Sequence, residues 1–382
     1  MPTPEITIEL EKIAHNVKAL KKLYGSKGIN IFGVTKVVCG DPRLGKLLVD
    51  NGLNFLADSR IGNIKRMRDA DVQAKFLLLR TLLSEAESVV KYADISLNTE
   101  LPTIRELSKI AVKSNVAHKI ILMVELGDLR EGVMPIDLNN TVRNILKLQG
   151  IELVGIGTNL ACFGGIRPDE RKMRQLSSMA NDLEKKFNIS LSIISGGNSA
   201  NYNWFMSSDD LGRINNFRLG ESIFLGCEPL DKKPIPGLFT DAFTLYAEVI
   251  ESGFKPSVPY GEIGLDAFGN EPVFEDHGQI RRAVLGIGKQ DVRIEGLRPP
   301  PDMSILGASS DHLILNTNKT GLKVGDTVAF GLNYGSLLSS INSNTVAKRY
   351  VKTTDHRRIL QNGRGKRPAP QAAFSDGGNP RG

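Results

Sequence analysis

The chain has 382 residues, of which 41% are hydrophobic and 24% charged, and these are ordinary values for a globular protein. The formal net charge is +7, but seven basic and only two acidic residues lie beyond Val351, so the preceding part of the chain is nearly neutral and gives no indication of a nucleic-acid partner. No segment approaches about 18 consecutive apolar residues, and the first residues lack the pattern of a signal peptide. We therefore expect a cytoplasmic protein with no membrane partner.

Cysteines and histidines give no sign of a metal site. The three cysteines, Cys39, Cys162 and Cys227, lie far apart, and the five histidines show no metal-ligand spacing. We expect reduced thiols and no bound metal. Residues 352–382 are rich in Gly, Pro and Arg and poor in apolar residues, which predicts a disordered basic tail.

Eight short apolar segments alternate with amphipathic stretches in the first two thirds of the chain. The segments are residues 29–36, 54–59, 75–80, 93–98, 119–126, 152–159, 191–197 and 215–226. Strands that alternate with helices predict parallel pairing, and eight such units predict a (β/α)8 barrel of the TIM type. An open, doubly wound parallel sheet is the alternative.

The pattern changes after Gly226. Short β-rich segments follow, separated by Gly, Pro and Asp, and they predict a smaller, all-β C-terminal domain. We expect a barrel domain at residues 1–231, a β-rich domain at 232–351 and the tail at 352–382. The opening segment "EITIEL" could belong to either domain.

Lys36 is a misfit at the end of the first barrel strand, in "INIFGVTKVVCGDP". An ammonium group among apolar neighbours loses hydration, which favours the neutral, nucleophilic amine that forms Schiff bases with carbonyl compounds. The alternative is a lysine whose amine reaches solvent from the strand end. Lys36 taken alone favours this alternative, and the anion-binding pattern after strands seven and eight shifts the balance to the functional interpretation.

An anion-binding pattern follows strands seven and eight. "SGGNSANY" places Asn198 and Ser199 before a predicted helix, and "FRLGES" places Arg218 and Gly220 at the end of the eighth strand. Helix N-termini at these loops are common phosphate sites in barrels. A Schiff-base lysine and a phosphate site together suggest pyridoxal 5'-phosphate.

These segments resemble the alanine racemase superfamily, the fold-type III pyridoxal phosphate enzymes, and most closely its ornithine racemase branch. The resemblance extends in order over about residues 5–351 and includes "VELGDLREGV", "GIGTNLACFGG" and "LGIGKQDV". It implies a (β/α)8 barrel followed by a β domain, and a homodimer with shared active sites. The implied activity is a racemase that interconverts the L and D forms of a basic amino acid, ornithine or lysine, by two-base proton transfer.

The resemblance also implies roles for individual residues. Lys36 would hold the cofactor and act as one catalytic base. Ser199 and the backbone N–H groups of Gly220 and Glu221 would bind the phosphate, while Arg218 would face the pyridine nitrogen. The remaining cofactor positions are Arg130, near the cofactor oxygen or the substrate carboxylate, and Asn159, beside the ring.

The sequence departs from the alanine racemase pattern at the second catalytic base. Lys289 stands where that family has a tyrosine, so Lys289 is our candidate, with Tyr246, Tyr334 and Cys162 as alternatives. A basic substrate side chain also needs an acidic partner. Asp311 is our candidate for substrate binding, and the alternatives are Asp128, Glu262 and Asp266.

Three other functions stay open at this point. One is a non-catalytic pyridoxal phosphate-binding protein, although a β domain of about 120 residues is unnecessary for binding alone. Another is an alanine or broad-specificity racemase. The third is a decarboxylation or aldol cleavage on the same scaffold.

Overall fold

The computed structural model describes residues 3–352, and the rest of the predicted tail, 353–382, lies outside the described residues. The described chain divides into two compact units. The first unit, which we call the barrel unit, comprises Glu9–Ala242. The second, the sheet unit, combines the described residues up to Ile8 with those from Phe243 onward.

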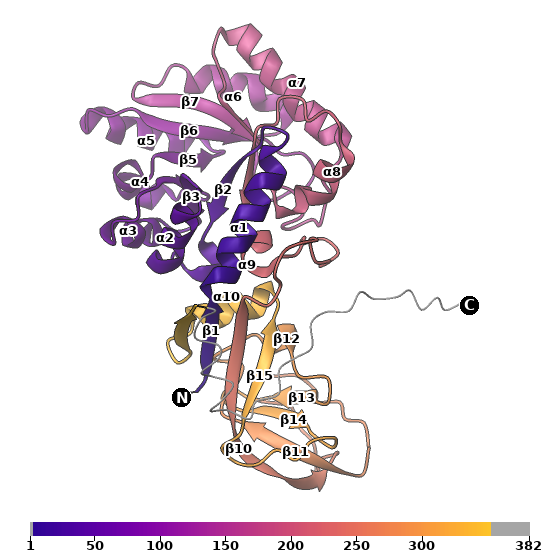
Figure 1. Cartoon of the computed structure of the whole chain (residues 1–382). Coiled ribbons are helices and arrows are strands. Elements are labelled where there is room, and N and C mark those ends of the chain that lie inside the picture. The colour runs from indigo at the N-terminus through magenta and orange to yellow at the C-terminus, as the bar shows by residue number, and fades with distance from the viewer. Residues whose placement is uncertain (1–2, 353–382) are drawn as a thin grey trace. The chain divides into compact units, whose positions relative to one another are not determined.

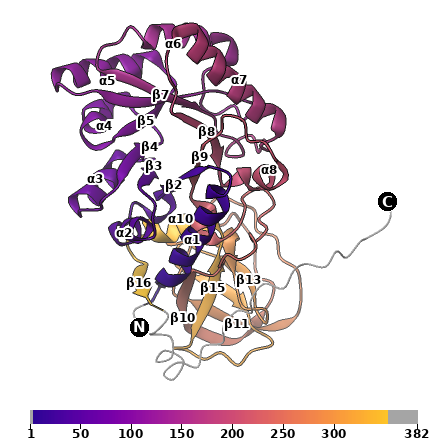
Figure 2. The ribbon, with the colours of Figure 1, turned by 45° about the horizontal axis from the view of Figure 1, so that its top comes forward.

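Eight parallel strands close into a barrel in the barrel unit, with helices on the outside (Figures 1 and 2). This confirms the predicted (β/α)8 barrel and excludes the open sheet. The strands are β2 (Asn30–Val34), β3 (Phe55–Asp58), β4 (Lys75–Leu78), β5 (Ile95–Asn98), β6 (His118–Met123), β7 (Ile151–Gly157), β8 (Ile193–Asn198) and β9 (Asn216–Leu219). Each of them lies within or overlaps one of the eight predicted segments.

The barrel helices are amphipathic and bury one face against the strands. They are α1 (Leu10–Gly25), α2 (Pro42–Asp50), α3 (Ile61–Asp69), α4 (Ala86–Tyr92), α5 (Leu101–Lys113), α6 (Leu138–Ile145), α7 (Glu170–Phe187), α8 (Tyr202–Ser207) and α9 (Glu221–Leu225). In α7, Met173, Leu176, Ala180 and Leu183 recur at spacings of three and four and are buried. Asp169 begins this helix by accepting a hydrogen bond from the Lys172 amide at 2.8 Å.

Apolar side chains fill the interior of the barrel. Phe32, Val34, Leu97, Ile121 and Val154 are among the buried members of this cluster, and they come from β2, β5, β6 and β7. The packed interior leaves the strand ends and the loops that follow them as the places where polar chemistry can gather.

The sheet unit is built on an eight-stranded antiparallel sheet, which confirms the predicted β-rich domain. Its strands are β1 (Glu5–Glu9), β10 (Phe243–Pro256), β11 (Gln279–Leu285), β12 (Leu297–Arg298), β13 (Ser304–Ala308), β14 (Leu313–Asn316), β15 (Thr327–Leu332) and β16 (Ala347–Val351). The opening strand β1 pairs with β10 and β16, so "EITIEL" contributes to this sheet.

One helix of the sheet unit, α10 (Tyr334–Asn342), was not part of the sequence prediction. Its signal is a single N-cap, Asn333, whose side chain accepts a hydrogen bond from the Ser336 amide at 2.9 Å. Short single-turn helices are also present in the chain: η1 (Lys36–Val38), η2 (Leu83–Glu85), η3 (Pro135–Asp137), η4 (Ser199–Asn201) and η5 (Ile294–Gly296).

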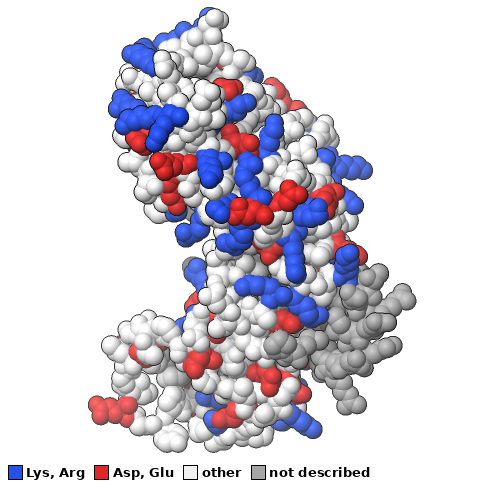
Figure 3. All heavy atoms as spheres, turned by 90° about the vertical axis from the view of Figure 1, so that its left-hand side faces the viewer, with Lys and Arg blue, Asp and Glu red and all other residues white. Residues whose placement is uncertain are grey.

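Charged side chains of both signs are mixed on the molecular surface. The face drawn in Figure 3 shows basic and acidic side chains close to one another on each unit. Between residues 3 and 352, the chain forms no helix long and apolar enough to span a membrane.

Candidate active site

The predicted cofactor residues follow five neighbouring barrel strands at their carboxyl ends. Lys36 follows β2, Arg130 follows β6, Asn159 follows β7, Ser199 follows β8, and Arg218 lies within β9. The barrel closes by pairing β9 with β2, so the order β6, β7, β8, β9, β2 is continuous. The structure therefore gathers these residues on one side of the barrel mouth.

Lys36 begins a tight turn after the strand. The sequence predicted that the strand would extend to Lys36, but β2 ends at Val34 and Lys36 starts the single turn η1. Val37 and Val38 are buried while Lys36 is half-buried. Two adjacent side chains are thus fixed by packing, which leaves the lysine directed out of the core.

A buried carboxylate fixes the position of this turn. Asp58, at the end of β3, is fully buried and accepts hydrogen bonds from the Thr35 hydroxyl at 2.8 Å and the Asn63 amide at 2.9 Å. The Arg60 backbone N–H donates a third bond at 3.0 Å. Burial raises the pKa of Asp58, although the three donors oppose this effect. The residue before Lys36 is therefore tied to the neighbouring strand.

A glycine completes the same turn. Cys39 and Gly40 both have positive φ, 55° and 58°. A Cβ atom on Gly40 would lie 2.5 Å from Cβ of Asn63, which is far inside the contact distance. Gly40 is thus required by the approach of α3 to the turn.

The loops after β8 and β9 meet through two serines. The Ser199 hydroxyl lies 3.0 Å from the Ser222 hydroxyl and accepts a hydrogen bond from the Ser222 amide at 3.2 Å. Both residues are buried. Ser199 begins η4, and Ser222 lies in the first turn of α9, so two helical N-termini are brought together as an anion site requires.

The predicted glycine and glutamate at the start of α9 have different environments. Gly220 is the N-cap, and a Cβ atom there would lie 3.2 Å from the Val34 carbonyl oxygen on β2. The Glu221 carboxylate accepts a hydrogen bond from the Lys232 amine at 2.9 Å. The side chain of Glu221 is therefore engaged away from the serines, which leaves its backbone as the group for an anion.

Arg218 is buried among neutral acceptors. It is 3% exposed, and its guanidinium donates to the Ser195 hydroxyl and to the Thr158 carbonyl oxygen, the latter at 2.7 Å. Within the described chain, Arg218 has no ion pair with a carboxylate. Burial lowers the pKa of Arg218 to about 10, so the group remains a cation at neutral pH.

Further polar side chains hold Arg218 in place through the Ser195 hydroxyl. The Ser195 hydroxyl donates to the Asn216 side chain, whose amide in turn donates to the Asn30 carbonyl oxygen at 3.2 Å. Ser195 and Asn216 are buried at 0% and 2% exposure. This hydrogen-bonded line runs inside the barrel and fixes the direction of the guanidinium.

Asn159 has a buried donor without a partner. Its Oδ1 atom accepts from the Asn198 amide at 3.1 Å and from Arg218 at 3.5 Å. Its Nδ2 atom and the Thr158 hydroxyl are buried with no hydrogen-bond partner in the structure. A buried donor of this kind is costly unless it has an acceptor, so the position suits contact with a bound group.

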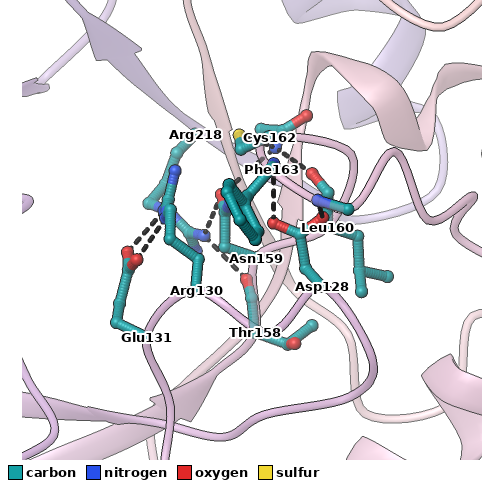
Figure 4. A network of polar contacts seen from close by, with 11 residues as sticks. Asp128, Arg130, Glu131, Thr158, Asn159, Leu160, Cys162, Phe163 and Arg218 are labelled. Atoms are coloured by element: carbon teal, nitrogen blue, oxygen red, sulfur yellow. Dashed lines mark hydrogen bonds and ion pairs between the residues drawn. The ribbon is translucent and has the colours of Figure 1, made fainter.

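Arg130 lies beside these residues in the loop after β6 (Figure 4). Its guanidinium forms a bidentate ion pair with Glu131. The Cys162 thiol, in the loop after β7, also interacts with Arg130 and lies 3.5 Å from the Asn198 amide. Cys162 is exposed and therefore accessible at the barrel mouth.

Asp128 holds the loop that carries Cys162. Its carboxylate accepts hydrogen bonds from the Phe163 amide at 3.1 Å and the Gly164 amide at 3.0 Å, and the residue is 1% exposed (Figure 4). A carboxylate that is buried and hydrogen-bonded in this way stabilises the conformation of the loop. It is therefore a poor candidate for recognising a substrate ammonium group.

Lys289 and Asp311 lie on adjoining loops of the sheet unit. The Lys289 amide donates to the Ser309 carbonyl oxygen at 2.9 Å, and the Lys289 amine lies 4.0 Å from the centre of the Phe268 ring. Asp311 is exposed and pairs with the His312 ring at 2.8 Å. This contact with His312 lowers the pKa of Asp311.

The alternative acids of the sheet unit differ in how their carboxylates are used. Asp266 accepts hydrogen bonds from the Phe268 and Asn270 amides, both at 2.8 Å, and organises a turn. Glu262 is exposed in the same long loop. The structure thus places Lys289 and Asp311 in the sheet unit and the predicted cofactor residues in the barrel unit.

Sequence reasoning missed four residues that complete the barrel site: Thr158, Ser195, Ser222 and Glu131. Ser222 and Thr158 stand next to residues that the pattern did single out, so their neighbourhood was the available signal. Ser195 could be found only from strand register, which places it two pairing steps from Arg218: Ser195 pairs with Asn216, and Asn198 pairs with Arg218.

Comparison with known proteins assigns the family. A model of the alanine racemase N-terminal domain matches residues 8–228, which is more than half of the chain. The chain belongs to the alanine racemase N-terminal domain family. The solved alanine racemase of Clostridium difficile 630 has a TM-score of 0.70 at 20% identity, and the match covers 92% of this chain and 96% of that one. This likeness shows the shared fold of the family.

Two curated relatives in the family match along nearly their whole length. The ornithine racemase of Acetoanaerobium sticklandii is 42% identical over 349 residues, covering 90% of this chain and 99% of the relative. The lysine racemase of Thermotoga maritima is 38% identical over 353 residues, covering 92% and 99%.

Proposed function

We propose that this protein is an amino-acid racemase that interconverts the L and D forms of a basic amino acid, ornithine or lysine, with pyridoxal 5'-phosphate as its cofactor. The observation that carries the proposal is the extent of the similarity to the two racemases of basic amino acids. Alanine racemases such as that of Caldanaerobacter subterraneus match only about half of the chain, at 29% identity. The similarity therefore favours a basic substrate over alanine.

The residues at the barrel mouth fit the proposed cofactor. The buried Asn159 amide lacks an acceptor, the Arg218 guanidinium has only neutral partners, and Ser199 and Ser222 join two helical N-termini. A phosphate ester at the serines and an aromatic nitrogen at Arg218 would satisfy these groups. When bound, pyridoxal phosphate supplies an electron-withdrawing ring that makes the Cα proton of an amino acid removable.

Lys36 holds the cofactor and moves the proton at its Nζ atom. The turn η1 and the buried Asp58 fix the lysine, so the amine is presented at one place above the strand end. Arg130 is the cation available for a substrate carboxylate or a cofactor oxygen. Its contact with Glu131 keeps the guanidinium at this position.

Arg218 determines the type of reaction in this proposal. A guanidinium donates a hydrogen bond to the ring nitrogen but does not give up its proton at neutral pH. The ring is then a weaker electron sink than a protonated ring, so charge stays close to Cα and the proton returns promptly. This favours racemisation over decarboxylation or transamination.

Lys289 is our candidate for the second base, and Tyr246, Tyr334 and Cys162 are the alternatives. Two bases on opposite faces of Cα are needed because one base returns the proton to the face from which it was taken. In the proposed organisation, residues 1–231 bind the cofactor and residues 232–351 close the site, with Asp311 available to bind the substrate side chain.

We further propose a homodimer in which each subunit completes the site of the other. Both units carry exposed apolar side chains, and these support the proposed homodimer because large exposed apolar areas mark interaction surfaces. In the barrel unit they lie in loops after strands, at Leu83, Leu129, Ile136 and Phe163. In the sheet unit they lie in the loop between β10 and β11, at Tyr260, Ile263, Leu265 and Val273.

A chiral assay with added cofactor tests the proposed function. L-ornithine, L-lysine and L-alanine are incubated with the full chain, and the D and L fractions are measured by chiral chromatography. We expect ornithine or lysine to approach a 1:1 mixture with no loss of total amino acid, and alanine to react much more slowly. If the protein binds the cofactor but changes none of the three amino acids, the racemase proposal is overturned and a non-catalytic pyridoxal phosphate-binding protein is supported.

A further inference from the structure

A pocket opens at the amino-terminal ends of the barrel strands, opposite to the ends that carry the candidate active site. Its volume is about 580 Å3, within the usual range for small-molecule sites. Residues from the starts of β3 to β8 line it, among them Phe55, Lys75, Ile95, His118 and Val154. We call it the amino-end pocket.

The floor of the amino-end pocket is apolar. Phe55 stacks on Phe32 with 4.4 Å between the ring centres and 16° between the ring planes. Ile95 and Val154 are buried members of the barrel core and also line the pocket, and Ile193 packs against the same cluster. A ligand that enters would place an apolar body against these side chains.

His118 is a buried polar group in the wall of the pocket. It is 3% exposed, and its Nε2 atom lies 2.8 Å from the Ser96 hydroxyl. The Asn98 amide donates to the same hydroxyl at 2.8 Å. The Ser96 hydroxyl therefore holds the His118 ring in place in the wall of the pocket.

The rim of the pocket carries more positive than negative charge. Arg68 pairs with Asp94 at 2.6 Å, and Lys119 lies 3.8 Å from Glu152. Lys75 and Lys91 have only aromatic contacts, with Phe55 at 5.6 Å and Tyr92 at 5.2 Å, and within residues 3–352 neither forms an ion pair with a carboxylate. Two cations are thus left to face a ligand at this opening.

From this arrangement we propose that the amino-end pocket is a second ligand site, which binds a small organic anion with an aromatic or branched apolar body. The apolar floor receives the body, and Lys75 and Lys91 meet the anionic group. The site lies at the opposite end of the barrel from Lys36 and does not depend on the proposed racemase activity. Its failure and that of the racemase proposal are therefore measured separately.

Binding of the fluorescent apolar sulfonate 8-anilinonaphthalene-1-sulfonate to the full chain tests the proposal. We expect saturable binding with one tight site per chain. Lys75→Glu reverses a rim charge and should weaken that site at least fivefold. Ser192→Trp places a large side chain at an exposed lining position and should remove it. Lys185→Glu makes the same charge change on α7, outside the lining residues, and should bind within twofold of the wild type.

The same titration can overturn the proposal. Absence of saturable binding to the wild type would do so, as would binding to Lys75→Glu and Ser192→Trp that equals binding to Lys185→Glu. Both lining substitutions are at exposed positions, so the variants should remain folded, and circular dichroism melting curves check this. A benzoate competition series on the wild type then distinguishes a site for carboxylates from one that accepts sulfonates alone.

Discussion

In its proposed role, Lys36 combines two requirements that usually exclude each other, since the lysine must be accessible to a small molecule and yet hold one position. The structure meets both by fixing its neighbours. Thr35, Val37 and Val38 are buried, and the Thr35 hydroxyl is bound to Asp58 at 2.8 Å. A side chain of high conformational entropy is thus presented from a rigid base, which lowers the entropy lost when it reacts.

Replacement of Lys36 by alanine should abolish both covalent cofactor attachment and turnover. We expect racemisation to fall at least about 1000-fold, because no other amine follows β2 at this place. Visible absorbance of the protein and the chiral assay measure the two effects. Lys46→Ala, which removes an exposed lysine of α2 paired with Asp50, serves as the control and should leave both unchanged. Cofactor that stays covalently bound after borohydride reduction of Lys36→Ala would contradict the assignment.

Lys289→Ala should separate proton removal from racemisation. With one base left, the enzyme can still take and return a proton on the face of Lys36, so in D2O one enantiomer should exchange its Cα hydrogen without inversion. We expect racemisation to fall at least about 100-fold while the cofactor remains bound. NMR and chiral chromatography follow exchange and inversion, with Lys255→Ala as a matched exposed lysine of β10. Unchanged racemisation would transfer the role to Tyr246, Tyr334 or Cys162.

The sequence predicted most of the residues that the structure gathers at the barrel mouth, but not the groups that hold them. Lys36, Ser199 and Arg218 stand out because polar residues at strand ends are conspicuous beside apolar runs. Ser195 and Asn216 do not, because a buried serine or asparagine within a strand has no local signature. Their role follows from the strand register that places them under Arg218.

At the scale of secondary structure, the turn η1 is where the prediction of a strand extending to Lys36 was wrong. Short apolar runs predicted all eight barrel strands, since each run is separated from the next by an amphipathic or polar stretch. The early end of β2 depends instead on a contact with β3 that is 22 residues away in sequence, between Thr35 and Ala57. Such tertiary contacts override local propensity.

Gly40→Ala should destabilise the turn that carries Lys36. The new Cβ atom would lie 2.5 Å from Cβ of Asn63, and φ of 58° is unfavourable for alanine. We expect a loss of about 2 kcal/mol or more in the free energy of unfolding, measured by urea titration. Gly62→Ala is the matched control, because a Cβ atom there has nothing within 4 Å and the site lies in α3. That variant should gain about 0.5–1 kcal/mol. Equal effects of the two changes would contradict the role of Gly40.

At the scale of the whole molecule, the candidate residues are divided between two units. Lys36, Arg130 and Arg218 belong to the barrel unit, whereas Lys289 and Asp311 belong to the sheet unit. The proposed dimer explains why a racemase would keep both units in one chain, since each sheet unit would supply the second base to a partner. The sequence pattern predicted a barrel and a β-rich part of the chain. It left open to which part the opening strand belongs, because that depends on strand pairing: β1 pairs with β10.

Mixing two inactive variants tests the shared site. Lys36→Ala and Lys289→Ala homodimers, dissociated and allowed to re-associate, should form mixed dimers with one intact site each. Random re-association then restores about a quarter of the wild-type activity. Each variant alone, carried through the same treatment, is the control. Absence of any recovery in a mixture shown by mass spectrometry to contain mixed dimers would mean that both residues act within one chain.

His118 should make the stability of the protein depend on pH. Burial lowers its pKa from 6.5 to about 4, against an opposing effect of Asp94. Between these values the unfolded chain binds a proton that the folded chain does not, so stability falls as pH decreases from about 7 to 4, by at most about 3 kcal/mol for this group. In His118→Gln, urea unfolding at several pH values should show a shallower decline. Parallel curves for the two proteins would contradict this.

The proposed cofactor residues follow β2 and the strands from β6 to β9, and Asp58 at the end of β3 holds the turn of Lys36, so the ends of β4 and β5 are left as an adjoining arc of the barrel mouth. Evolution or a protein engineer can therefore vary the loops after those two strands without touching the groups proposed to hold the coenzyme. Libraries confined to that arc are the economical way to redirect the enzyme toward new side chains, and they would leave the common chemistry at Cα in place.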